Sequence, residues 1–391
     1  MDHLIDYAKQ IVNKLKSKGH VAYFAGGFVR DKLLNRPSCD IDIATSATVE
    51  QVSSLFPKCI YVGAVFGVVQ VVIHKHAFEV ATFRKDVGYE DGRRPEKIEM
   101  ASDVEDAKRR DFTINGMFFD PTTDEVIDYV GGREDLTKKC IRAIGDPLKR
   151  FEEDRLRMIR AVRFATLLHF YIETETKEAI RQHASKLFPA VSIERIIDEL
   201  KKMAQHRTFI NALELLEETT LLKILFPKAQ INKEALDFLP VEMPFVLKLY
   251  QLFTHLEKQE IDSIFSHLKL SNKELDLIEN VQTCDLNAKD HTFTTLFAKP
   301  FGFEIALAKV AVLENRKELK NQLKEKQTEL KDYVHMLQNQ TFPIKAKDLI
   351  ELGVEKGPNL GRLLGKAIEI SINERLQDKD QILKKLNMSD S

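Results

Sequence analysis

The hydrophobic pattern of this 391-residue chain changes once, near Leu148. Before that point, short runs rich in β-branched and aromatic residues alternate with turn residues, which is typical of a small sheet. After it, apolar residues recur almost only at helical spacing, as in SIERIIDELKKMAQ and NALELLEETTLLKIL. A chain of this length also exceeds one ordinary domain. The pattern predicts an α+β fold, with a mixed α/β N-terminal part followed by an all-helical remainder.

The N-terminal part is expected to begin with a helix over Asp2–Lys16, which Gly19 ends. Six β-prone runs are predicted, over Val21–Ala25, Cys39–Thr45, Cys59–Val62, Val68–His74, Ala77–Thr82 and Glu125–Val130. The fourth and fifth runs are close enough to form a hairpin around Lys75–His76. In the helical part, Phe151–Phe170 is predicted to form one long helix.

The composition of the chain argues against several classes of protein. The net charge of −1 argues against a generally basic nucleic-acid binder, although local basic patches remain compatible with it. Four scattered cysteines lack zinc-ligand spacing, so neither a disulfide framework nor a structural zinc is expected. The longest apolar run is too short to span a bilayer, and the N-terminus does not resemble a signal peptide. We expect a cytoplasmic protein without membrane contact.

Asp40 and Asp42, in CDIDIAT, are the first candidate functional residues. Alternate residues of a strand project from the same face, so the two carboxylates can converge on one point. Clustered carboxylates suit Mg²⁺, which also coordinates substrate phosphates. Two such ions can activate a hydroxyl group and stabilise a pyrophosphate leaving group. The alternative is an acidic pair on a solvent-facing strand.

The segment Gly26-Gly27-Phe28-Val29-Arg30-Asp31 lies between a predicted strand and a predicted helix. Glycines there allow the backbone to approach a phosphate closely, and a helix N-terminus favours an anion. The guanidinium of Arg30 could add a charge-assisted contact. A glycine pair alone indicates only a turn. Its position shortly before the two aspartates favours a nucleotide site.

Two further segments carry clustered charge. RRDFTIN places Arg110 and Asn115 where they could contact a triphosphate or a ribose, although paired arginines often form only surface ion pairs. In EDRLRMIRAVRFA, Asp154 and Arg157 are predicted to be i,i+3 neighbours on a helix and to face one ligand together. Arg160 and Arg163 follow at three-residue steps and could reach phosphates or RNA.

Asp154 and Arg157 together suggest a reader of nucleotide bases. The carboxylate can accept the exocyclic amine of cytosine or adenine, and the guanidinium can donate to the neighbouring ring acceptors. Guanine and uracil carry a carbonyl where that amine would be, so they would leave the carboxylate unpaired. An intrahelical salt bridge on a charged surface is the alternative.

In this order and spacing, the four segments resemble the class II tRNA nucleotidyltransferases (CCA-adding enzymes) and the related bacterial poly(A) polymerases. FAGGFVRD with CDIDIAT resembles the first motif of the family, RRDFTIN the second, DYVGGREDL the third and EDRLRMIRAVRFA the fourth. The resemblance is dense over about residues 20–170. Beyond them, only the helical character and GPNLGRLL are similar to the family.

The resemblance implies a role for each matching residue. Asp40 and Asp42 would bind catalytic Mg²⁺, and Asp111 is one candidate for a further metal carboxylate. Asp154 and Arg157 would select the base. The remaining residues implied to bind the nucleotide are Gly26, Gly27, Arg30, Arg110, Asn115, Arg160 and Arg163.

The implied architecture is a catalytic head over residues 1–148, a helical neck that reads the base over 149–210, and an elongated helical body and tail that binds tRNA over 211–391. Helices such as Lys317–Lys331 could contribute to tRNA binding, although a solvated face explains that stretch equally well. The expected partners are tRNA, ATP and CTP. The chain is expected to be a monomer or a homodimer.

The leading interpretation is stepwise addition of CCA to the tRNA 3′ end. A-addition alone and poly(A) synthesis share every motif, and a catalytically dead RNA-binding protein is the interpretation from another class. CC-addition alone is disfavoured because the segment Arg84–Lys108 looks full length. It is polar and contains glycines, as mobile segments do. The chain has no His-Asp dipeptide, so the phosphohydrolase domain of some relatives is not expected.

Overall fold

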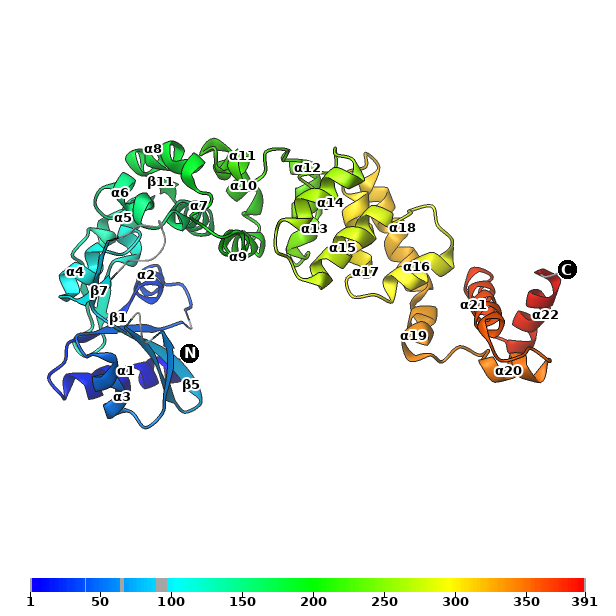
Figure 1. Ribbon diagram of the computed structural model, residues 1–391, viewed down its shortest axis with the longest axis horizontal. Helices are drawn as coiled ribbons and strands as arrows, with labels where there is room; N and C mark the ends of the chain where they lie inside the picture. The colour runs from blue at the N-terminus through cyan, green and yellow to red at the C-terminus, as the bar shows by residue number, and fades with distance from the viewer. Residues whose placement is uncertain (1, 39, 64–66, 89–96, 390–391) are drawn as a thin grey trace. The chain divides into compact units, whose positions relative to one another are not determined.

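A computed structural model describes residues 2–38, 40–63, 67–88 and 97–389. The chain divides into two compact units, residues 1–229 and residues 230–391 (Figure 1). The first contains the whole of the large sheet, and the second is entirely helical in its described part. The predicted α+β fold, with a mixed head before many helices, is therefore confirmed. The finer boundaries after residues 148 and 210 remain predictions.

The strands of the first unit form one seven-stranded sheet in the order β3-β4-β5-β2-β1-β8-β9. Their bounds are β1 Ala22–Ala25, β2 Asp42–Thr45, β3 Cys59–Gly63, β4 Val68–Ile73, β5 His76–Thr82, β8 Phe118–Asp120 and β9 Glu125–Ile127. Neighbours are antiparallel except β2 and β5, which run parallel with Ile43 opposite Val80. Two small sheets pair β6 Arg84–Val87 with β7 Lys97–Met100, and β10 Cys140–Ile141 with β11 Tyr171–Ile172.

Helices cover the large sheet and extend the first unit (Figure 1). Their bounds are α1 Asp2–Lys16, α2 Gly27–Leu33, α3 Val49–Leu55, α4 Asp103–Lys108, α5 Gly132–Lys138, α6 Pro147–Glu153, α7 Leu156–Leu168, α8 Thr174–His183, α9 Ile193–Ala204, α10 Phe209–Glu218 and α11 Leu221–Leu225, with 3₁₀ turns η2 Thr113–Asn115 and η3 Ala184–Lys186. On the apolar side of α1, Ala8, Ile11, Val12 and Leu15 are fully buried. That helix begins and ends where its periodicity predicts.

The core of the first unit lies on both faces of the sheet. On one face, Phe24 packs edge-to-face against Phe28 of α2, and both rings are buried. On the other, Phe83 and Phe118 pack together beside α4, so the sheet is sandwiched at the point where β1 meets β2. Burying such aromatic side chains contributes roughly 1.5–3 kcal/mol each, which makes this part of the sheet a firm base for the residues at the strand ends.

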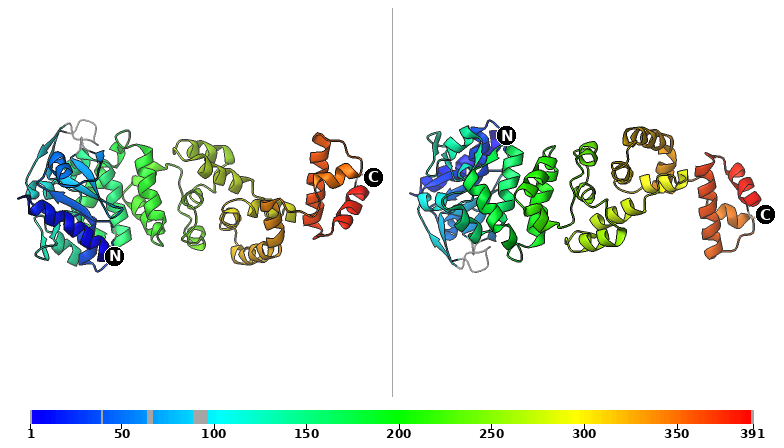
Figure 2. Two further views of the ribbon diagram at one scale, coloured as in Figure 1. Left: turned by 90° about the horizontal axis from the view of Figure 1, so that it is seen from below. Right: turned by 90° about the horizontal axis from the view of Figure 1, so that it is seen from above.

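The second unit consists of short helices around small apolar clusters (Figure 2). Their bounds are α12 Lys233–Phe238, α13 Phe245–Tyr250, α14 Lys258–Ser266, α15 Asn272–Thr283, α16 Asp290–Phe297, α17 Gly302–Val310, α18 Arg316–Glu329, α19 Lys331–Asn339, α20 Ala346–Glu351, α21 Pro358–Asn373 and α22 Lys379–Ser389. Of α18, the helix richest in lysine, only Leu323 is buried. No helix within the described ranges is long and apolar enough to cross a membrane.

One predicted helix is wrong. Phe151–Phe170 is not continuous, because the chain leaves the helical conformation at Asp154, where φ is −144° and ψ is 104°. Helix α6 ends at Glu153, and α7 runs from Leu156 to Leu168, so the last two residues of the predicted range lie outside the helix and before β11. Asp154 precedes Arg155, the N-cap residue of α7, and its Oδ1 accepts a hydrogen bond from the Leu156 N–H at 3.1 Å.

Candidate active site

The first unit contains an open cavity of about 530 Å³ beside the ends of β1 and β2. Its lining residues come from the glycine turn, from the aspartate pair and from the segments around η2 and α7. They are Gly26, Gly27, Arg30, Asp40, Asp42, Arg109, Arg110, Asp111, Asn115, Asp154, Arg157, Arg160, Arg163 and Phe164. Every candidate residue named from the sequence, including Asp111, lies on this one cavity, together with two that were not assigned to it: Arg109 and Phe164.

Gly26 shapes the cavity wall between β1 and α2. Its φ of 67° lies in the left-handed region, which residues with a side chain rarely adopt. A Cβ at this position would also stand 3.5 Å from Nη1 of Arg110 and 3.8 Å from Oδ2 of Asp42. A side chain here would therefore stand between a cation and a carboxylate of the cavity wall, a space that glycine leaves free.

Asp40 and Asp42 stand at the start of β2, separated by the buried Ile41. Asp40 precedes the first residue of the strand, and Cys39, the first residue of the predicted run, lies outside the described residues. Burial, together with the negative charges of Asp40 and Glu79, raises the pKa of Asp42 to about 6 against the opposing effect of Arg110. Negative charge is thus concentrated here beyond what the neighbouring arginine offsets.

This excess of negative charge fits a divalent cation. Mg²⁺ binds through one or two carboxylates and takes its other ligands from water and substrate phosphates, so it does not need a closed cage of side chains. Accordingly, no group of three or more His, Cys, Asp or Glu side chains close enough to hold a metal occurs among the described residues. Glu79, one strand away on β5, had no sequence signal because its position depends on the β2–β5 register.

Asp111 is an anchor for neighbouring groups and is a poor candidate for a further metal ligand. Its Oδ2 accepts two hydrogen bonds from Arg160, at 2.9 and 2.6 Å, and its Oδ1 accepts from the Phe112 N–H at 2.8 Å. Asn115 donates to the same Oδ1 at 3.2 Å and accepts from Nη1 of Arg30 at 2.8 Å. A chain of hydrogen bonds therefore ties the glycine turn, η2 and α7 together across the cavity.

Arg110 is held by a buried carboxylate that was not singled out from the sequence. Oδ2 of Asp106, on α4, accepts from Nε and Nη2 of Arg110 at 3.1 and 2.9 Å, while Oδ1 accepts from Arg109 at 3.0 and 2.7 Å. Asp106 is only 1% exposed. The i,i+3 and i,i+4 spacing in DAKRR was a usable signal for these pairs.

Asp154 and Arg157 both line the cavity, but not as neighbours on one helix. Asp154 lies in the break between α6 and α7, and its carboxylate accepts from Nη2 of Arg195 on α9 at 3.1 Å. Arg157, in the first turn of α7, donates to Oε2 of Glu153 at 2.7 Å and to the carbonyl oxygen of Arg109 at 3.1 Å. Each of the two side chains thus has its own partner, so the predicted helical pairing is wrong in its geometry.

Comparison with known proteins identifies the family of this chain. The family described as "Poly A polymerase head domain" matches residues 22–142, and the one described as "Probable RNA and SrmB- binding site of polymerase A" matches residues 169–231. The CCA-adding enzyme of Anoxybacillus flavithermus is 33% identical over 404 residues, which cover 99% of this chain and 98% of the relative. The chain belongs to the CCA-adding enzyme family.

Two further relatives describe the extent of the likeness within the CCA-adding enzyme family. The enzyme of Geobacillus stearothermophilus is 48% identical over 213 residues, which cover 54% of this chain and 52% of the relative. The crystal structure of the Bacillus stearothermophilus CCA-adding enzyme in complex with CTP is 31% identical and superposes with a TM-score of 0.80. The superposition covers 100% of this chain and 99% of the chain in that crystal structure.

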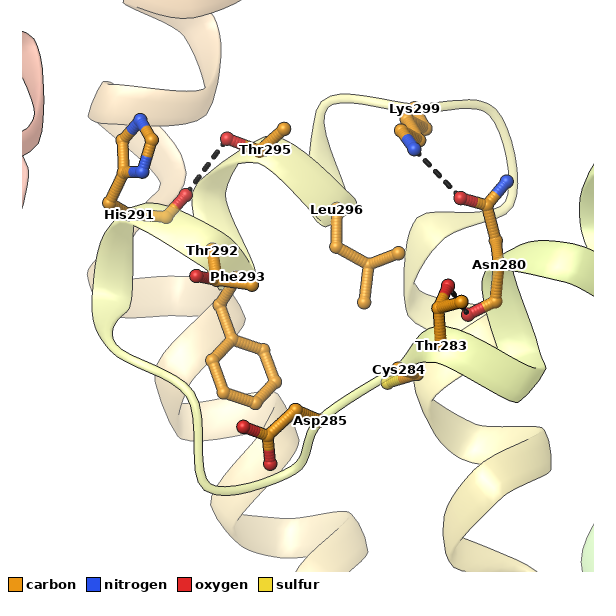
Figure 3. A pocket seen from close by; sticks show the side chains of 10 residues that line it. All are labelled: Asn280, Thr283, Cys284, Asp285, His291, Thr292, Phe293, Thr295, Leu296 and Lys299. Atoms are coloured by element: carbon orange, nitrogen blue, oxygen red, sulfur yellow. Dashed lines mark hydrogen bonds between the residues drawn. The ribbon is translucent and has the colours of Figure 1, made fainter. Parts of the chain in front are cut away.

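A separate cavity of about 270 Å³ lies in the second unit, between α15 and α16 (Figure 3). Its lining includes Phe293 and Leu296, and Lys299 donates to Oδ1 of Asn280 at 2.7 Å at its edge. It contains none of the residues through which the chain resembles the CCA-adding enzyme family. The cavity of the first unit is therefore the candidate active site.

Proposed function

We propose that this protein adds the CCA sequence to the 3′ end of tRNA, using CTP and ATP and releasing pyrophosphate. One observation carries the proposal: all the residues expected to bind metal, triphosphate and base, from four separate segments, line a single cavity. Membership of the CCA-adding enzyme family and the likeness to a relative solved with CTP support it.

Asp40 and Asp42 are the residues that would hold Mg²⁺. Bound there, Mg²⁺ would supply activation of the tRNA 3′-hydroxyl and neutralisation of charge on the departing pyrophosphate. The two aspartates keep their carboxylates at the open end of β2, within reach of the space that Gly26 leaves free. Metal dependence is general for nucleotidyltransferases of this family, and Mg²⁺ is the ion that an all-oxygen site favours.

Four arginines would bind the triphosphate. Arg30, Arg110, Arg160 and Arg163 approach the cavity from α2, from the end of α4 and from α7. Guanidinium groups form paired hydrogen bonds with phosphate oxygens, and each of these groups is already oriented by a carboxylate. Preorganised cations stabilise the charge that develops during phosphoryl transfer without reorganising. Asn115 would serve the same site by orienting Arg30 or by contacting the ribose.

Asp154 and Arg157 would read the incoming base. Asp154 can accept the exocyclic amine shared by cytosine and adenine, and Arg157 can donate to the adjacent ring nitrogen or oxygen. To do so, Asp154 and Arg157 must present to the base the side-chain atoms that bind Arg195 and Glu153 in this structure. A uracil or guanine carbonyl placed against Asp154 would leave a carboxylate oxygen unpaired, which costs about 1–3 kcal/mol or more.

The helical part after α7 would bind the tRNA. Residues 169–231 match a family described as a probable RNA-binding site, and duplex RNA is recognised mainly through its backbone and shape. The chain's net charge of −1 does not oppose this role, because phosphate contacts depend on local lysines and arginines.

The deciding experiment supplies purified protein with Mg²⁺ and two tRNA transcripts, one lacking CCA and one ending in CC. CTP and ATP are added separately and together, and product length is read at single-nucleotide resolution. Three added nucleotides that require both substrates establish CCA addition. A single A restricted to the CC-ending transcript would indicate an A-adding enzyme, and a long ladder with ATP alone would indicate poly(A) synthesis. No extension under any condition would leave only an RNA-binding protein.

A further inference from the structure

We propose that Phe164 is a positioning residue for triphosphate binding, whose ring holds three phosphate-binding arginines together without neutralising them. The proposal rests on the proposed function of the cavity. It assigns to Phe164 a role that no segment of the sequence indicated, since an aromatic residue on a helix is usually part of the core.

Three guanidinium groups surround this one ring. The guanidinium carbon of Arg163 lies 4.2 Å from the ring centroid, and those of Arg30 and Arg160 each lie 5.2 Å from it. All three distances are within the range of a cation–π interaction. Arg160 and Arg163 precede Phe164 on α7, but Arg30 comes from α2, so the ring also joins the glycine turn to α7.

The position of the ring favours a strong interaction. Phe164 is 6% exposed, and its ring lines the cavity. Removal of water strengthens the attraction between a cation and the negative face of a ring. Phe164 is therefore placed where such contacts have their largest effect.

Clustered guanidinium groups need this support because they repel one another. Burial lowers the pKa of Arg163, and the charge of Arg160 lowers it further, against the opposing effect of Glu199. Each of the three arginines also has its own carboxylate: Asp31, Asp111 and Glu199. With the three cations already balanced by three carboxylates, a fourth carboxylate at the centre would give the group a net negative charge and repel phosphates. A phenyl face attracts the guanidinium groups and adds no charge of its own, so it holds the group together without adding a further carboxylate.

A substitution of the neighbouring Phe112 distinguishes the proposed role of Phe164 from a purely structural one. Phe112 packs edge-to-face against Phe164, with centroids 5.8 Å apart, and is fully buried. No cation–π contact involves Phe112 among the described residues. Phe112→Leu therefore removes a comparable buried ring from the same packing without removing a contact to an arginine.

The test compares wild type with Phe164→Leu, Phe164→Met, Phe164→Tyr and Phe112→Leu. The KM for CTP and for ATP, kcat, and inhibition by inorganic tripolyphosphate, a probe that has no base, are measured on a tRNA transcript. For Phe164→Leu we expect both KM values and the tripolyphosphate inhibition constant to rise about tenfold, because cation–π contacts worth about 1.4 kcal/mol in total are lost. We expect kcat to change less than about threefold, and the preference for CTP over UTP to be unchanged.

Phe164→Met preserves the bulk without the ring and should repeat the loss if the leucine variant fails to fold. Phe164→Tyr preserves the ring and should restore KM to within about twofold of wild type. Phe112→Leu should lower the melting temperature and leave KM unchanged. Equal KM values for Phe164→Met and wild type would overturn the proposal, as would a similar KM rise in Phe112→Leu. If wild type does not extend tRNA, the proposed function fails instead, and tripolyphosphate binding measured by calorimetry still tests Phe164.

Discussion

Two carboxylates in the same cavity differ in what surrounds them, and the difference indicates their roles. Burial and the nearby charges of Asp40 and Glu79 raise the pKa of Asp42 to about 6. Burial also acts to raise the pKa of Asp111, but the charge of Arg160 and its hydrogen bonds hold that pKa at about 2. Asp42 therefore carries an incompletely compensated charge suited to a cation, whereas Asp111 is a stable partner for an arginine.

Replacing Asp42 with asparagine should separate activity from stability. Without its charge the metal is lost, so kcat should fall by about a thousandfold or more, as expected when several kcal/mol of transition-state stabilisation disappear. The melting temperature in the absence of metal should stay the same or rise, because a repulsive charge has been removed. Calorimetry and single-nucleotide extension measure the two quantities. Residual activity near the wild-type level would contradict the assignment of Asp42 to the metal.

The Asp111–Arg160 pair predicts an acid-dependent loss of stability. A folded pKa of about 2 lies below the ordinary value for Asp, so the pair stabilises the fold at pH values above about 4. This contribution, about 2 kcal/mol, is lost as the pH falls from about 4 to about 2. Asp111→Asn should therefore lower the free energy of unfolding strongly at pH 7 and less at pH 3. Urea titrations at both pH values check this, and an equal deficit at both would contradict it.

At the residue scale, the sequence identified the groups that line the cavity but not the partners that orient them. Asp40, Asp42 and Arg30 are close in sequence to glycines or to one another, so local spacing indicated them. Glu199 and Arg195 act on the cavity from a helix more than thirty residues away. Their contribution depends on how α9 packs on α7, which local periodicity cannot specify.

At the element scale, α9 supports the cavity through one face. Arg195 and Glu199 are four residues apart, so they project from the same side of the helix. Arg195 reaches Asp154, and Glu199 accepts from Nε of Arg163 at 2.5 Å. One helix therefore orients both the proposed base-reading carboxylate and a proposed phosphate-binding arginine.

This arrangement predicts that Arg195→Gln relaxes base selection. With its partner gone, Asp154 can adopt more than one orientation, so discrimination for CTP and ATP over UTP and GTP should fall by about tenfold, a change of about 1.4 kcal/mol. Stability should change little, because the Arg195 side chain is 25% exposed and such pairs contribute about 0–1 kcal/mol. Competitive incorporation assays with all four nucleotides measure the selectivity.

The matched control for Arg195→Gln is Arg181→Gln. Arg181 pairs with Glu218 and does not line the cavity. Its loss should leave the ratio of incorporated nucleotides unchanged. A similar relaxation in both variants would show that general loosening of the helices, and not the contact with Asp154, determines selectivity.

Helices and strands were predicted well where a local pattern of hydrophobic or β-prone residues determined them. Helix α1 and strands β1, β3, β4 and β5 appear within a residue or two of their predicted bounds. The described parts of the segment Arg84–Lys108 form β6, β7 and α4, and residues 89–96 lie outside the described residues. The mobility expected of this segment stays a prediction. The break at Asp154 was missed because the apolar periodicity continues through it, whereas Asp154 adopts an extended conformation and accepts a hydrogen bond from the Leu156 N–H.

At the scale of the whole molecule, the chain has two compact units with separate cores, and the proposed nucleotide site belongs to one of them. Differential scanning calorimetry should therefore show more than one transition. A saturating nucleotide with Mg²⁺ should raise only the transition of residues 1–229, by about 2.7 kcal/mol of stabilisation at 100 times Kd. A single transition that shifts as a whole would indicate that the two units unfold cooperatively.

Every arginine that lines the cavity already has an acidic partner: Asp31 for Arg30, Asp106 for Arg109 and Arg110, Glu153 for Arg157, Asp111 for Arg160 and Glu199 for Arg163. Without substrate, the positive and negative side chains of the site thus nearly balance, and the electrostatic potential outside the cavity is small. A polyanion such as RNA is then not drawn into it by charge alone, and only a short, metal-paired triphosphate that matches the guanidinium geometry gains by entering. The affinity for nucleotide should accordingly respond weakly to ionic strength, while the affinity for tRNA should fall steeply as salt is added.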